Sequence, residues 1–295
     1  MTDSGGCPDP GSATHTVRLA TRGPFDGLGI MRFLADHAIR GIETSTPTSY
    51  ARRLRLPTGT ASLVVSLDDS GDGPGVVCSA RLSSDEDLPV LVALVRRLFD
   101  LDADSATIDD ALRADPALAA SVVLHPGVRL PGAVDAEEVL FRTLLGQQVS
   151  VAAARTVLGR VSAELTEGSG LFPTAAQFAE RGSAVLRGPA RRVASIVAIA
   201  EAVASGRLVL DARMPAAELI ATLVEQPGIG PWTASYVAMR VLGDPDILLA
   251  SDLIMLQSAQ ALGLPHDAKS LAEHGRRWAP WRSYAGLHLW RSIGR

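Results

Sequence analysis

The hydrophobic pattern of this chain changes type near residue 104, and that change restricts its fold class more than any other feature. Before that point, apolar and polar residues alternate as in half-buried strands, at 15–21, 50–56, 61–69 and 75–83. Helical spacing interrupts them at 29–38 and 86–99. Connections this short exclude parallel crossovers, so we predict an antiparallel α+β sheet domain over 15–104, after a flexible tail at 1–14.

From residue 105 to 295 the strand pattern disappears and only helical patterns follow. Asp135 is a candidate cap of one helix, with Glu138 as its reciprocal partner, and Ser150 is a candidate cap of the next. Further helices are predicted at 174–181, 189–205, 215–225, 232–242, 253–262 and 269–277. The expected architecture is a TBP-like sheet domain followed by a mostly α-helical, two-part region.

Composition excludes several classes of protein. No apolar run is long enough to span a bilayer, and the first residues lack a signal-peptide pattern, which predicts a cytoplasmic protein. Cys7 and Cys78 are the only cysteines, too few for a disulfide framework or a four-cysteine metal site, and we expect no metal. The net charge of −4 does not by itself indicate a nucleic-acid partner.

The segment 223–236, LVEQPGIGPWTASY, predicts two helices joined by a very tight turn. Gly228 and Gly230 allow the turn and a close approach of the backbone to a partner, and Pro231 suits the start of the second helix. Free backbone N–H groups at that start would bind a phosphate oxygen and position DNA without reading its sequence. A plain helix–helix connection is the alternative, but apolar residues at helical spacing on both sides favour phosphate binding.

Asp252 lies 22 residues beyond Gly230, after one helix and a returning loop. That separation could bring its carboxylate to the mouth of a cleft beside the bound DNA backbone. The alternative is that Asp252, or Ser251, only caps the helix that follows. Taken alone, the cap is the stronger interpretation. Asp244 and Asp246 have the pattern of turn residues.

Taken together, the hairpin and the delayed aspartate resemble the helix-hairpin-helix DNA glycosylases, and within them the AlkA-type DNA-3-methyladenine glycosylase II family. The resemblance covers nearly the whole chain after the tail, and its motifs occur in order. They are Pro24-Phe-Asp, LFD near 98–100, RLPGAVDAEE at 129–138, LLGQQVSVAAA at 144–154, PGIGPWTASYVAMR at 227–240, LLASDLI at 248–254 and RRWAPWRSYAGLHLW at 276–290.

The resemblance implies a role for each matching residue. Asp252 corresponds to the catalytic aspartate, which stabilises an oxocarbenium-like sugar. Gln148 falls where the family carries a wedge that fills the gap left by the flipped base, although an amide replaces an apolar side chain. The base pocket would comprise Trp232, Tyr236, Trp290, Phe33 and Ile254, the last in place of a leucine. The DNA-binding helix-hairpin-helix, at 219–241, would use Pro227, Gly228, Ile229, Gly230 and Thr233.

The implied activity is hydrolysis of the N-glycosidic bond of alkylated bases in base excision repair. Such a base must be flipped out of the duplex and stacked on aromatic rings, and a cationic N-alkylpurine attracts indole faces. Strand-nicking glycosylases use an amine, and Lys269, the chain's only lysine, lies beyond the site. We therefore predict a monofunctional enzyme that acts as a monomer on double-stranded DNA with damaged bases. No cofactor is required, with a monovalent cation at the hairpin left open.

The sequence argues against three other functions. A non-catalytic DNA-binding module would not need a pocket carboxylate with aromatic residues on three separate elements. A bifunctional glycosylase/lyase conflicts with the lysine count. A repair methyltransferase needs a cysteine in a Pro-Cys-His setting, which neither Cys7 nor Cys78 has. Trp278 and Trp281 are better explained as core residues than as pocket residues.

Overall fold

The computed structural model describes residues 14–68, 70–71 and 73–292 of this 295-residue chain. Residues 1–13 of the predicted tail at 1–14, with Cys7, lie outside the described residues. Thr14 already belongs to the first strand, one residue earlier than predicted, where it pairs with Arg81. Within these ranges, no helix combines the length and the apolar character that crossing a membrane requires.

The predicted antiparallel sheet is confirmed, and it has five strands in the order β1-β5-β4-β3-β2. Val65, at the centre of the sheet, is paired with Tyr50 on one side and Cys78 on the other, and all three are buried. The strands are β1 (Thr14–Ala20), β2 (Glu43–Ser45), β3 (Ser49–Leu56), β4 (Gly59–Leu67) and β5 (Gly75–Leu82). The sequence did not predict β2, because three residues are too few to show alternation.

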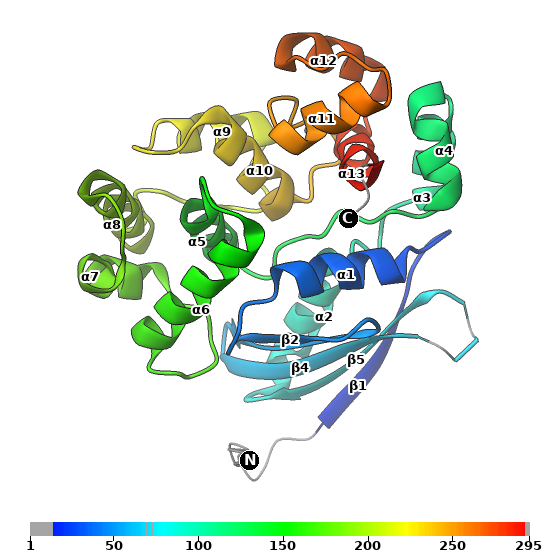
Figure 1. The fold of residues 1–295 in the computed structure, drawn as a ribbon. Helices are drawn as coiled ribbons and strands as arrows, with labels where there is room; N and C mark the ends of the chain where they lie inside the picture. The colour runs from blue at the N-terminus through cyan, green and yellow to red at the C-terminus, as the bar shows by residue number, and fades with distance from the viewer. Residues whose placement is uncertain (1–13, 69, 72, 293–295) are drawn as a thin grey trace.

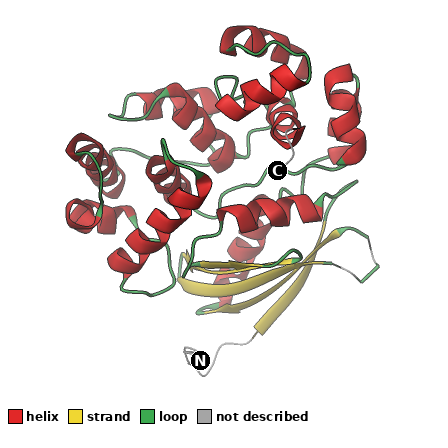
Figure 2. Cartoon of the chain, viewed as in Figure 1, coloured by secondary structure: helices red, strands yellow, loops and turns green. Residues whose placement is uncertain are grey.

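Helices α1 (Gly27–His37) and α2 (Leu88–Leu98) accompany the sheet, and the remaining helices lie beyond it (Figures 1 and 2). They are α3 (Ser105–Arg113), α4 (Pro116–Leu124), α5 (Ala136–Gly146), α6 (Val151–Thr166), α7 (Ala175–Val185), α8 (Ala190–Ala204), α9 (Ala216–Val224), α10 (Pro231–Leu242), α11 (Leu253–Ala261), α12 (Ala268–His274) and α13 (Arg282–Ser292). The segment predicted as one helix at 269–277 is α12 followed by a short 3₁₀ turn, Gly275–Trp278.

Three hydrophobic cores underlie this arrangement. The first core lies between the sheet, α1 and α2. The second contains residues from all the helices from α5 through α10. The third contains residues from α3 and α4 together with α11, α12 and α13. Helix α13 was not predicted, because residues 283–289 are all buried and so show no amphipathic period. Representative buried residues are Met31 and Phe99 in the first core, Phe141 and Val237 in the second, and Leu118, Met255 and Leu289 in the third.

The helix caps agree with the prediction except at one reciprocal bond. Asp135 accepts the backbone N–H of Glu138 at 2.8 Å, and Ser150 accepts that of Ala153 at 3.2 Å. The Glu138 side chain, however, does not return to the cap as predicted. It receives two hydrogen bonds from Arg52 on β3, at 3.0 and 2.6 Å. A buried carboxylate gains more from a bidentate guanidinium than from one backbone N–H.

Candidate active site

Asp252 lies at the N-terminus of α11, where its carboxylate accepts three N–H groups. Its Oδ1 atom accepts the backbone N–H of Met255 at 2.9 Å and the indole N–H of Trp290 at 2.9 Å. Its Oδ2 atom accepts the indole N–H of Trp232 at 3.1 Å. All three donors, together with the helix N-terminus, interact favourably with a negative charge. The helix cap and the predicted site carboxylate are therefore one side chain.

The two tryptophans that meet at Asp252 come from different helices. Trp232 is the second residue of α10, directly after the hairpin, and Trp290 lies near the end of α13. Tyr236, one turn along α10, stacks on Trp232 with ring centroids 5.3 Å apart and planes 6° from parallel. The structure thus brings together Asp252 and three of the five predicted pocket residues.

Phe33 reaches this group through an arginine that the sequence did not single out. The Arg240 guanidinium lies 4.8 Å from the Phe33 ring centroid and 5.7 Å from that of Tyr236. It donates to the Tyr236 hydroxyl at 2.8 Å and to the backbone carbonyls of Pro131 and Gly132. Arg240 therefore fixes both aromatic residues to the segment that follows the sheet domain.

His37 is a second residue that the sequence analysis missed. Its ring stacks on Phe33 at 4.2 Å, and its Nδ1 atom is hydrogen-bonded to the Phe33 carbonyl oxygen at 2.8 Å. Burial lowers the pKa of His37, and the Arg240 charge lowers it further. The sequence contains a signal for both Arg240 and His37. Each lies four positions after a predicted pocket aromatic residue and therefore shares its helix face.

The two remaining predicted contacts differ in their placement. Ile254 lies two residues after Asp252 on α11 and is partly exposed. Gln148 is exposed between α5 and α6 with a left-handed backbone, φ +62°. Its neighbour Gln147 donates to the Gly228 carbonyl at 3.1 Å and to the Thr233 hydroxyl at 3.2 Å. The Gln148 loop and the hairpin are therefore fixed to each other.

The hairpin between α9 and α10 combines a buried base with an exposed tip. Ile229 and Leu223 are buried in the second core, whereas Pro227, Gly228 and Gly230 are exposed. Gly228 has φ +88°, a conformation that side chains disfavour. No side chain caps α10 in the described residues, so the first-turn N–H groups remain open to a ligand. Thr233 is buried, and its hydroxyl accepts a hydrogen bond from Gln147, so its contact with DNA stays a prediction.

Residues outside this group have structural positions. Trp278 is buried and donates to Asp115 at 2.8 Å, and Trp281 packs edge-on against Tyr284. Lys269 is exposed on α12. Over residues 14–292, leaving out 69 and 72, no three His, Cys, Asp or Glu side chains are grouped so as to hold a metal ion.

Sequence comparisons identify the proteins to which this chain is similar. The AlkA N-terminal domain family matches residues 16–135. The chain is 41% identical over 293 residues to the probable bifunctional transcriptional activator/DNA repair enzyme AlkA of Mycobacterium tuberculosis, covering 96% of this chain and 58% of that relative. It is 32% identical over 283 residues to DNA-3-methyladenine glycosylase 2 of Escherichia coli, covering 92% and 95%. The chain therefore spans little more than half the length of the mycobacterial relative.

Solved structures show the same fold. A 3-methyladenine DNA glycosylase from Archaeoglobus fulgidus superimposes with a TM-score of 0.78 at 18% identity, over 93% of this chain and 97% of that one. The 3-methyladenine DNA glycosylase of Schizosaccharomyces pombe, solved in complex with abasic DNA, gives a TM-score of 0.57 at 26% identity, over 63% and 95%.

Proposed function

This chain belongs to the family of AlkA-type DNA-3-methyladenine glycosylases, and from that premise we propose that it excises alkylated bases from double-stranded DNA by hydrolysing the N-glycosidic bond. The observation that supports this most strongly is the carboxylate of Asp252, held by the indole N–H groups of Trp232 and Trp290. The yeast relative's complex with abasic DNA supports a DNA duplex as the partner.

In this proposal the damaged nucleotide is flipped out of the duplex and stacked on the aromatic side chains. The C1′–N bond breaks, its electron pair leaves with the base, and positive charge develops on the sugar. Asp252 stabilises that charge and accepts a proton from the water that attacks C1′. A carboxylate oxygen has two lone-pair positions. Two donors already fill those of Oδ1, so Oδ2, with one donor, is the oxygen that faces the sugar.

The DNA-binding residues act beside this carboxylate. The open N–H groups of the hairpin hold a backbone phosphate, and Gln148 enters the gap left by the flipped base. The participation of a monovalent cation at the hairpin stays a prediction, as does the monomeric state. Lys269, the only lysine of the chain, lies exposed on α12, a different helix from the one that Asp252 caps, so we expect no Schiff base and an intact abasic site as the product.

The test uses duplexes that contain 3-methyladenine, 7-methylguanine or hypoxanthine, with free base and strand breaks measured before and after alkali. The Asp252→Asn variant should release base about 100- to 1000-fold more slowly in single turnover, because the developing charge loses its counter-charge. Asp267→Asn, at the N-cap of α12, is the matched control and should retain full activity.

An Asp252→Asn variant as active as the wild type would remove the carboxylate from the mechanism. Strand cleavage without alkali would contradict the monofunctional assignment. Tight binding to abasic DNA with no release of any of the three bases would instead favour the non-catalytic DNA-binding module.

A further inference from the structure

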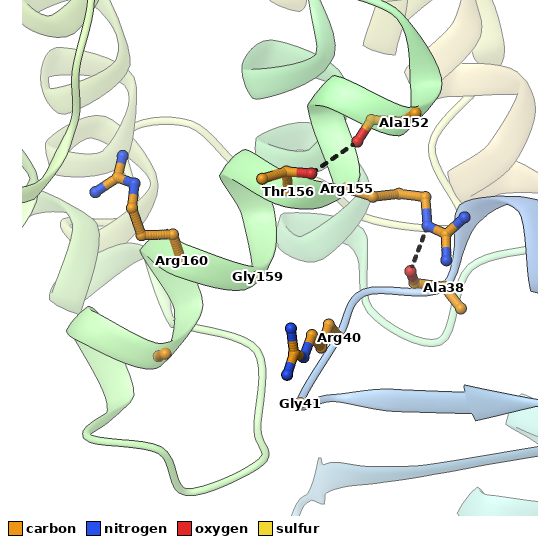
Figure 3. Close-up of a pocket in the computed structure, with 9 residues that line it drawn as sticks. Ala38, Arg40, Gly41, Ala152, Arg155, Thr156, Gly159 and Arg160 are labelled. Carbon is orange, nitrogen blue, oxygen red and sulfur yellow. Dashed lines mark hydrogen bonds between the residues drawn. The ribbon is translucent and has the colours of Figure 1, made fainter.

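A groove of about 620 Å³ lies between α6 and the chain that joins α1 to β2, and it shares no residue with the candidate active site (Figure 3). Ala38, Arg40 and Gly41 form one wall. The other wall is a stripe at helical spacing along α6, formed by Ala152, Arg155, Thr156, Gly159, Arg160 and Ala163. A Cβ atom at Gly159 would lie 3.3 Å from the Arg40 carbonyl oxygen, so glycine allows the close approach of the two walls.

The groove is positively charged, and two of its three arginines are not neutralised. Arg160 is paired with Glu164 at 2.8 Å. Arg155 uses its Nε atom to donate to the Ala38 carbonyl at 2.8 Å, and its two terminal nitrogens have no partner within the described ranges. The Arg40 side chain has neither a hydrogen bond nor an ion pair to any described residue, and no carboxylate lines the groove. Exposed, unpaired guanidinium groups suit a phosphate ligand.

The position of the groove relates it to the predicted DNA contacts. Helix α6 begins at Val151, directly after the loop that carries Gln148. The lining stripe therefore starts within one turn of that loop and continues to Ala163, a length of about 16 Å at 1.5 Å per residue. One strand of B-DNA carries a phosphate every 3.4 Å or so of its axis, so this length matches about five phosphates.

We propose that this groove binds the phosphodiester backbone of the duplex that flanks the lesion, through Arg40 and Arg155. The proposal rests on the proposed function, because it takes the Gln148 loop to lie at the lesion. It adds a second contact to the DNA backbone, on the sheet-domain side of α6, beyond the backbone contact of the hairpin. The groove holds the flanking duplex and takes no part in the chemistry.

The test measures binding, by fluorescence anisotropy over a range of salt concentrations, to duplexes with a central tetrahydrofuran abasic analogue. One duplex is short, and two others extend it by at least one helical turn on one side or the other. We expect one extension to strengthen wild-type binding several-fold. The Arg40→Ala/Arg155→Ala variant should lose that gain, and its negative slope of log K against log salt should become shallower by about 1.8, or about 0.9 for each lost phosphate contact.

Two further variants separate a local effect from loss of fold or of net charge. Arg40→Glu removes no hydrogen bond of the fold and should also abolish the gain from the longer duplex. Arg81→Ala/Arg113→Ala removes two arginines from β5 and α3 and should behave as the wild type. Equal wild-type affinity for short and extended duplexes, or an unchanged salt slope in both Arg40 variants, would overturn the groove proposal. Base release by the wild type from the short duplex is scored separately, and its absence would refute the proposed function.

Discussion

Arg240 places a permanent positive charge between the rings of Phe33 and Tyr236. A cationic alkylated base and this guanidinium repel each other, so they do not share the same ring faces. We therefore propose that a cationic base stacks on Trp290 or on the face of Trp232 that Tyr236 does not cover. At the scale of single residues, Arg240 therefore biases where a base can stack.

His288 gives the protein a pH dependence that can be assigned to one side chain. Burial first, and then the charges of Arg291 and His125, lower its pKa to about 4 against the opposing charge of Asp26. Its Nδ1 atom is hydrogen-bonded to Ser121 at 2.9 Å. Between an unfolded pKa of about 6.5 and the folded value, the unfolded chain binds more protons, so stability is lost as the pH falls.

We therefore expect His288→Gln to flatten the decline of unfolding free energy between pH 6.5 and 4, where His288 contributes at most about 1.4 kcal/mol for each pH unit. Chemical denaturation at several pH values measures it. Asp100, whose pKa burial raises to about 6, acts in the opposite direction, so the difference between the variant and wild-type profiles is the quantity that matters. His266→Gln, at an exposed imidazole, is the control. Parallel profiles for wild type and His288→Gln would refute the assignment.

At the scale of elements, the loop before Asp252 is attached to the start of α13. Asp246 forms an ion pair with Arg282 at 2.7 Å, and the Ser283 hydroxyl donates to the carbonyls of Asp244 and Ile247. The sequence pattern alone indicates no role for Asp244 and Asp246 beyond a turn. These bonds hold α13, and with it Trp290, in register with the loop that leads to Asp252.

The hairpin turn provides an element-scale prediction. Gly228→Ala places a side chain at φ +88°, where left-handed backbone costs about 1–2 kcal/mol, with a new Cβ 3.4 Å from that of Ser195. Gly206→Ala carries a similar strain at φ +74° with nothing within 4 Å. Both variants should lose similar stability in thermal unfolding, but only Gly228→Ala should weaken binding to abasic DNA. Equal binding by the two variants would argue against phosphate binding at the hairpin.

At the scale of the whole molecule, a buried ion network joins the sheet to the helical region. Glu138 of α5 is bonded to Arg52 of β3, and Arg142 contacts both Glu138, at 2.7 Å, and Glu43, at 2.6 Å. Although burial raises it, the two arginines bring the pKa of Glu138 down to about 2. The network therefore connects the first hydrophobic core, at the sheet, to the second, which contains α5.

Arg52→Met should therefore destabilise the protein by about 3–5 kcal/mol, because it leaves buried carboxylates with less compensation. Arg53→Met, at the exposed neighbour, should cost far less. Urea unfolding followed by tryptophan fluorescence measures both. Since all four tryptophans lie outside the sheet domain, a loss seen by circular dichroism but not by fluorescence would show that the network stabilises the sheet domain alone. Equal stability of the two variants would contradict the prediction.

The sequence alone was sufficient for the features that depend on neighbours along the chain. Strand alternation, the caps at Asp135 and Ser150, and the Gly228 turn are local, because their free energies come from residues a few positions apart. They predicted the α+β class and the hairpin, and family resemblance identified Asp252 and its candidate partners. Short or uniformly buried elements, such as β2 and α13, left no periodic signal.

The tertiary structure decided which side chains from separate helices and strands lie in contact. Trp232 and Trp290 lie 20 and 38 residues from Asp252, and only packing of α10, α11 and α13 brings both indoles to one carboxylate. Tertiary packing also places Arg240 beside Phe33. It likewise brings Arg52 to the Glu138 carboxylate, which bonds to that arginine and not to the backbone N–H of the Asp135 cap. These contacts follow from how helices and sheet share three cores, and the spacing of residues along a chain does not determine how separate elements pack.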